Sequence, residues 1–231
     1  MIAIAACVPA ARAQQVEDMP HMRMTVLRTP TTGDSARAAA VAASARADLA
    51  QYADYHKALA DGFHIFAPNV PQHVYHFTSR ARALEAVVHF DPSKPTSLLY
   101  ERTGDSTYRL IGAMYTAPRW LSPADLNSRV PLSIAQWHLH TNWCLPPKDH
   151  RNRAQERGSD GQPEFGPKGS ITTEAACRAA GGRFYPELFG WMVHVHPMAH
   201  NPADVWGAED MAHMGDMHMG DMHMGGPPTQ G

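Results

Sequence analysis

The sequence predicts an α+β fold, in which a mostly antiparallel sheet packs against one long Ala-rich helix and shorter helices, with disordered N- and C-terminal segments. Two observations predict it. An Ala-rich stretch over residues 33–62 has helical periodicity, and the later segments alternate apolar and polar side chains between turn residues, which is typical of strands. We divide the chain into a signal peptide (1–13), a flexible arm (14–32), a single α+β domain (33–206) and a tail (207–231).

The long helix is expected over residues 33–62, because Ala is the best helix former and Gly62 suits the left-handed position after a helix end. Its buried stripe should include Val41, Ala45 and Leu49, which are spaced four residues apart. We expect extended segments at 63–68, 72–77, 96–101, 108–116, 136–144 and 190–197, and short helices at 78–88, 122–130 and 174–180.

The first 13 residues, MIAIAACVPAARA, combine a short apolar run with the small-x-small ending of a secretory signal peptide. We expect cleavage after Ala13 and a periplasmic or secreted mature protein. The alternative is a lipoprotein, because residues 4–7 are similar to a bacterial lipobox, which would leave Cys7 as a lipid-modified N-terminus. No later stretch reaches the length of about 18 apolar residues that a transmembrane helix needs.

Charge and cysteine content narrow the class of protein. With 20 basic and 22 acidic residues, the net charge of -2 excludes the strongly basic surface of a nucleic-acid-binding protein. Cys144 and Cys177 remain after removal of the signal peptide, and two cysteines in an exported protein usually form a disulfide. Thiolate ligation of a metal is the alternative. We predict a Cys144–Cys177 disulfide that ties a short helix to the end of a strand.

The C-terminal tail carries the strongest chemical signal, an imperfect repeat of Met-Gly-Asp-Met-His. Thioether sulfur is a soft ligand that suits Cu(I), and imidazole also binds Cu(II). The alternatives are a solvated low-complexity tail without a partner and a sacrificial sink for oxidants. A smaller Met-rich segment, MPHMRM at residues 19–24, is interpreted as an auxiliary metal arm. The expected tail ligands are Met211, His213, Met214, Met217, His218, Met219, Met222, His223 and Met224.

Two segments of the folded part place histidines at alternate positions, which in a strand share one face. His138 and His140 would share a face with Asn142 and Cys144, opposite Trp137, Leu139, Thr141 and Trp143. His194 and His196 would share a face with Met192. If the two strands are neighbours, four imidazoles and a thioether converge on a site for Cu(II) or Zn(II). A solvated or groove-lining histidine face without metal is the alternative.

The function that these patterns favour is an exported copper-binding protein. It would buffer or deliver copper through the tail and a His-lined site on the folded domain, with metal ions as partners and a second copper protein as a candidate partner. One alternative is a metal-dependent enzyme built on His138, His140, His194 and His196, with an open coordination position. Another is a non-catalytic envelope protein with an incidental tail. The sequence contains no nucleophile motif, phosphate loop or carboxylate pair, so no catalytic residue is assigned.

Four short motifs resemble the oil-body-associated protein family and its bacterial relatives over residues 62–144. They are GFHIFA from Gly62, HVYH from His73, RLIG from Arg109 and WHLH from Trp137. That family implies little about mechanism, and the signal peptide, the cysteine pair and the Met/His tail depart from its pattern. The whole chain is also similar to a group of exported bacterial proteins with no assigned activity.

Overall fold

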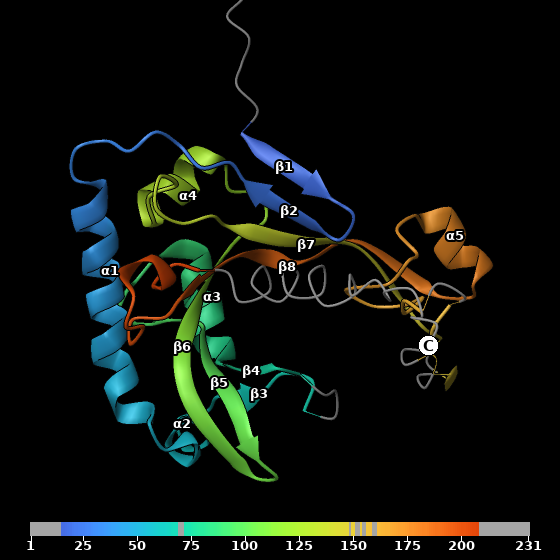
Figure 1. The fold of residues 1–231 in the computed structure, drawn as a ribbon, viewed down its shortest axis with the longest axis horizontal. Coiled ribbons are helices and arrows are strands. Elements are labelled where there is room, and N and C mark those ends of the chain that lie inside the picture. Colours follow the sequence, from blue (N-terminus) through green and yellow to red (C-terminus); the bar gives the residue numbers. More distant parts are fainter. Residues whose placement is uncertain are drawn as a thin grey trace, which may run out of the picture.

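The computed structural model describes residues 15–68, 72–147, 149–150, 153, 156–158 and 161–207. Within them, an eight-stranded antiparallel sheet packs against helices, so the predicted α+β class is confirmed (Figure 1). The signal peptide predicted at 1–13 and the tail ligands from Met211 to Met224 lie outside the described residues. None of the helices within the described part is long and apolar enough to cross a membrane.

The sheet has the strand order β1-β2-β7-β8-β6-β5-β4-β3. Its strands are β1 (Val16–Met19), β2 (Met22–Thr25), β3 (His64–Ile65), β4 (Val74–Thr78), β5 (Ser97–Gly104), β6 (Thr107–Ala117), β7 (His138–Leu145) and β8 (Arg183–Val195). The helices are α1 (Asp34–Leu49), α2 (Tyr55–Ala60), α3 (Arg80–Val88), α4 (Pro123–Arg129) and α5 (Glu174–Ala179), with single 3-10 turns at η1 (Ala50–Tyr52) and η3 (Pro202–Asp204).

The helix predicted over 33–62 is divided into α1, η1 and α2. The division comes at Asp54, whose backbone is extended and whose side chain accepts a hydrogen bond from the His56 backbone N–H. Aspartate is a favoured N-cap, because its carboxylate satisfies a backbone donor that the first turn leaves open. A second helix therefore begins where the Ala-rich pattern alone predicts a continuous one.

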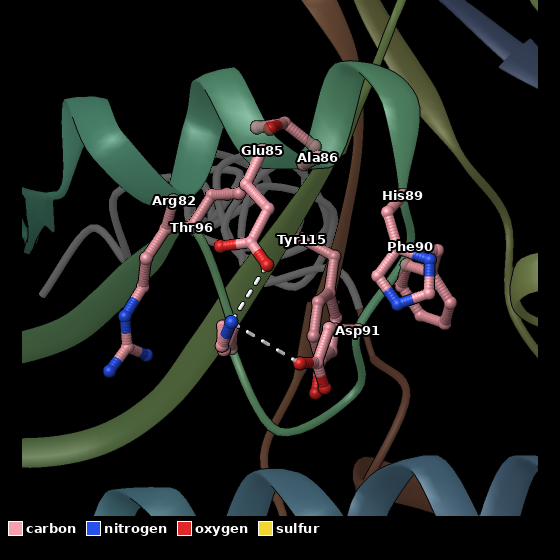
Figure 2. Close-up of a pocket in the computed structure, with 10 residues that line it drawn as sticks. Arg82, Glu85, Ala86, His89, Phe90, Asp91, Thr96 and Tyr115 are labelled. Carbon is pink, nitrogen blue, oxygen red and sulfur yellow. Dashed lines mark hydrogen bonds and ion pairs between the residues drawn. The ribbon is translucent and has the colours of Figure 1, made fainter.

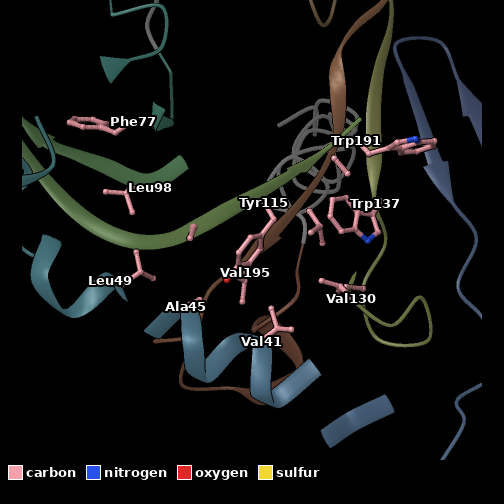
Figure 3. Packing of buried hydrophobic residues seen from close by; sticks show 14 of the residues in the cluster. Val41, Ala45, Leu49, Phe77, Leu98, Tyr115, Val130, Trp137, Trp191 and Val195 are labelled. Carbon is pink, nitrogen blue, oxygen red and sulfur yellow. The ribbon is translucent and has the colours of Figure 1, made fainter. Parts of the chain in front are cut away.

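The main core lies between α1 and the face of the sheet that we call the outer face (Figure 3). Val41, Ala45 and Leu49 of α1 are buried there, as their spacing predicts. The sheet contributes aromatic and branched side chains from successive strands, among them Phe77, Leu98, Tyr115, Trp137, Trp191 and Val195. Because these side chains are buried on the outer face, the residues between them in each strand point to the opposite face of the sheet.

The opposite face, which we call the inner face, is concave. Strands β4 and β8 are three strand spacings apart, or about 14 Å in a flat sheet. Yet the ring centroids of His76 on β4 and His194 on β8 lie 5.6 Å apart. A second contact joins Phe66, after β3, to Phe189 on β8 at 5.5 Å. The sheet therefore curls until residues of distant strands meet across its inner face.

The prediction of a flexible arm at 14–32 is wrong for residues 16–25, because these form the hairpin β1–β2 at one edge of the sheet (Figure 1). Strand β2 pairs with β7, which would otherwise leave an open edge. The Thr25 hydroxyl accepts a hydrogen bond from the Trp137 backbone N–H at 2.9 Å, and Thr25 is fully buried. This edge pairing outweighs the polar composition that suggested a free arm.

The predicted disulfide is confirmed. Cys144 at the end of β7 is bonded to Cys177 of α5, with Cα atoms 5.5 Å apart. Both cysteines are fully buried and pack with Phe165 in a small cluster separate from the main core. The bond thus fixes α5 against the end of β7.

Candidate metal centre

The two strands that carry the histidine pairs are neighbours. Strands β7 and β8 pair antiparallel, and His138 lies directly opposite Met192. Direct partners have Cβ atoms about 4.5–5.5 Å apart. The predicted condition that the two strands be adjacent is therefore met, and it brings His138 beside Met192 on the inner face.

Four imidazoles form a cluster on this face. The ring centroids of His138 and His194 are 5.1 Å apart, those of His138 and His140 are 5.5 Å apart, and those of His76 and His194 are 5.6 Å apart. His76 is the member that sequence reasoning missed. It is a lone histidine of β4, and only the curl of the sheet brings it to His194.

The fourth predicted member, His196, lies at the margin of the cluster. Its Nδ1–H donates to the Ile111 carbonyl oxygen at 3.2 Å. The imidazole lies over Gly112, where an added Cβ would come within 2.6 Å of Nδ1. Gly112 therefore provides the space for this ring, and the carbonyl bond directs Nδ1 away from a shared site.

Burial keeps the central imidazoles neutral. Burial, together with a smaller effect of the nearby imidazoles of His140 and His76, lowers the pKa of His138 to about 3. Burial, followed by the same kind of repulsion from His138, holds the pKa of His194 well below its usual range. Neutral imidazole is the form that binds metals, so both rings are held in their ligand form at neutral pH.

His194 has an unusual deficit of hydrogen bonds. It is 5% exposed, and neither its Nδ1 nor its Nε2 has a hydrogen-bond partner. A neutral imidazole has one N–H donor and one acceptor nitrogen, and leaving a buried polar group unsatisfied costs about 1–3 kcal/mol. Such a group calls for an explanation, and a bound ion or an ordered water that accepts or donates the missing hydrogen bonds would provide one.

Backbone irregularities shape the rim of the cluster. The predicted alternation along β7 holds through Thr141 and is wrong from Asn142 onward, because Asn142 adopts a φ of 55°. The ring of Trp143 therefore turns to the inner face and packs on His140 at 4.9 Å, and Cys144 points into the disulfide cluster instead.

A matching irregularity in β8 places a second aromatic ring beside Trp143. Residues 138 and 140 of β7 pair with residues 192 and 188 of β8, so the β8 strand bulges between them. Phe189 lies in this bulge with a φ of 64° and contacts both Trp143 and Phe66. Bulges of this kind re-aim side chains next to functional sites. Phe66, Phe189 and Trp143 thus form a series of ring contacts that ends at His140.

The ring spacings have the size that a shared ion requires. A metal–nitrogen bond of about 2.0–2.1 Å places an imidazole centroid roughly 3.2 Å from the ion, so two tetrahedral ligands have centroids about 5 Å apart. The pairs measured above are 5.1–5.6 Å apart. In the described residues, however, no three His, Cys, Asp or Glu side chains are arranged around one point as ligands.

Two hollows elsewhere offer little to a ligand. The hollow under α3 has a volume of 10 Å³, which is room for about one water (Figure 2). Lys94 is one of its lining residues and forms ion pairs with Glu85 (2.7 Å) and Asp91 (3.7 Å). A wider hollow of 490 Å³ lies on the outer side of β2, β7 and β8. Its Arg23 already pairs with Asp18 (2.6 Å) and Glu187 (3.1 Å).

No protein family, curated protein or solved structure matches the chain.

Proposed function

We propose that this is an exported copper-binding protein that buffers or delivers the metal. The Met/His-rich tail captures copper, and the histidine cluster of the inner face holds it in the folded domain. The observation that carries the proposal is His194, which is buried among three other imidazoles with both ring nitrogens unpartnered. A bound ion would supply a partner for one nitrogen and offset the cost of burying the ring.

To become a site, the cluster must reorient its imidazoles, because no three ligand side chains surround one point in the part of the chain that the structure describes. The χ2 torsion of histidine is broad, so an imidazole can turn toward an ion without a change in the backbone. The backbone positions are fixed by the pairing of β7 with β8 and by the outer core beneath them. Burial also favours neutral rings, which avoids competition between protons and metal at neutral pH.

Export is supported by the disulfide and by the sequence of the first residues. Disulfides persist in oxidising compartments and are rare in the cytosol. The Cys144–Cys177 bond is fully buried, where it holds α5 on β7. Methionine is a suitable capture ligand in such a compartment, because thioethers do not form disulfides. The tail repeat places its thioethers and imidazoles a few residues apart.

The test compares copper content in three full-length proteins purified from copper-supplemented cells. They are the natural chain, a tail variant in which the tail methionines become Ser and the tail histidines become Gln, and the tail variant with His194→Leu. We expect the tail variant to hold less copper than the natural chain and His194→Leu to remove the remainder. His56→Gln, at an exposed histidine paired with Asp54, is the matched control and should change nothing. Absence of copper from all three proteins would contradict the proposal.

A further inference from the structure

Methionines are distributed unequally between the two faces of the sheet. The four methionines that the structure describes as buried are Met22, Met24, Met114 and Met192, each 4–7% exposed. Met114 and Met192 pack together with Leu99 in a cluster separate from the main core. The main core, on the outer face, contains no buried methionine among its described members and uses Leu, Val, Ala and aromatic residues.

The buried methionines alternate with the histidines across the strands. In one row, Met24 of β2, His138 of β7 and Met192 of β8 are direct cross-strand partners. In the next rows, Met22 lies opposite His140, and Met114 of β6 lies opposite His194. Direct partners on one face are within side-chain contact of each other. Each clustered histidine of β7 and β8 thus has a thioether on an adjacent strand.

Packing alone does not account for this arrangement. Methionine is a flexible filler of irregular cores, and a curled sheet has an irregular inner face. A role in space filling, however, does not explain why each of these methionines lies opposite a histidine. It also leaves the ring nitrogens of His194 without a hydrogen-bond partner. Thioether sulfur and imidazole nitrogen together make a recognised donor set for a soft transition metal.

The charge of the donors selects among metals. Imidazole and thioether are both neutral, so the ion would enter a buried site without a compensating anion among these ligands. The cost of burying an ion by Born solvation rises with the square of its charge, so a divalent ion costs about four times as much as a monovalent one. The softness of the thioether donors and the absence of a compensating anion therefore both favour a soft monovalent ion.

We propose that the inner face is a mixed thioether–imidazole site for a soft monovalent cation, Cu(I) or Ag(I), with Met24 and Met192 as ligands beside His138 and His194. This inference rests on the proposed copper function and specifies its ligands and oxidation state. It replaces the Cu(II) or Zn(II) expected from the histidines alone.

The test uses the full-length tail variant, so that only the folded domain binds. Ag(I) serves as a redox-silent probe, and Cu(I) affinity is measured anaerobically by competition with a chromophoric chelator. The test variant carries Met24→Leu and Met192→Leu, and the matched control carries Met198→Leu, a partly buried methionine that packs on the main core. Exchange of Met for Leu conserves volume, so the fold should be retained.

We expect one Ag(I) to shift the 13C-methyl resonances of Met24 and Met192 and to leave that of Met198 in place. The double variant should bind Cu(I) at least about tenfold more weakly, because even residues outside the ligand shell change metal affinity by that factor. If the double variant binds both ions as tightly as the tail variant, and His194→Leu abolishes binding, the site uses imidazoles alone. That outcome overturns this inference and leaves the copper function standing. If the tail variant binds neither ion, the folded domain has no soft-metal site and this inference fails, whereas the copper function fails only if the natural chain binds no copper either.

Discussion

Replacement of His194 by Leu should stabilise the metal-free protein while it removes metal binding. The substitution eliminates an unsatisfied donor and an unsatisfied acceptor, each of which costs about 1–3 kcal/mol when buried. The different shape of Leu offsets part of that gain, since imperfect core substitutions cost about 1–3 kcal/mol. We expect a net rise of about 1–3 kcal/mol in the free energy of unfolding, or roughly 2–12 °C in Tm for a domain of this size.

The assay is equilibrium unfolding by denaturant with a strong chelator present, followed by thermal unfolding with and without Cu(I). Copper should raise the Tm of the natural chain and leave that of His194→Leu unchanged, because a ligand stabilises only the state that binds it. His56→Leu, on the exposed face of α2, should stay within about 0.5 kcal/mol of the natural chain. A loss of several kcal/mol on His194→Leu would refute the reasoning, because it would mean that the imidazole already makes stabilising contacts in the metal-free protein.

Three further predictions concern the scaffold, the pH dependence and the tail. Removal of the disulfide by Cys144→Ala and Cys177→Ala should lower the free energy of unfolding by about 3.7 kcal/mol, the loop-closure value for a sequence separation of 33, measured by urea denaturation. No change would show that the bond adds no constraint. Because burial depresses the pKa of His138 to about 3 and that of His194 as well, the unfolded chain binds protons below pH about 6.5 that the folded chain does not. Stability of the metal-free protein should therefore fall by about 1.4 kcal/mol per pH unit for each ring between about pH 6 and pH 4, and a flat profile would contradict the burial argument. Replacement of the tail methionines Met211, Met214, Met217, Met219, Met222 and Met224 by Leu should lower the Cu(I) stoichiometry in a chelator competition assay, and an unchanged stoichiometry would assign the tail no role.

The period-two pattern of the histidines predicts much of the site. It places His138 with His140 on one face of a strand, and the structure confirms that their strand lies beside the one that carries His194. The same pattern fails at Asn142, because a backbone irregularity with a φ of 55° reverses the face of every later residue. A bulge of this kind leaves no signal in hydrophobic periodicity, so the turn of Trp143 toward His140 could not be predicted.

The contribution of β4 and β2 depends on tertiary structure that a single sequence does not specify. His76 reaches His194 because the sheet curls, and curvature arises from the sum of twists over several strands. The MPHMRM segment has the composition of a metal arm, yet Met22 and Met24 lie within a strand that covers the edge of β7. Composition therefore drew attention to these methionines, and strand pairing shows that they lie on the inner face.

The central claim is that the folded domain holds copper on its inner face, independently of the tail. Anomalous diffraction at the copper edge, from crystals of the Cu(I)-loaded tail variant, locates the ion directly. We predict a single strong peak between the side chains of His138, His194 and Met192, within bonding distance of His194. Copper found only at surface sites, with the inner face metal-free at full loading, would contradict the account.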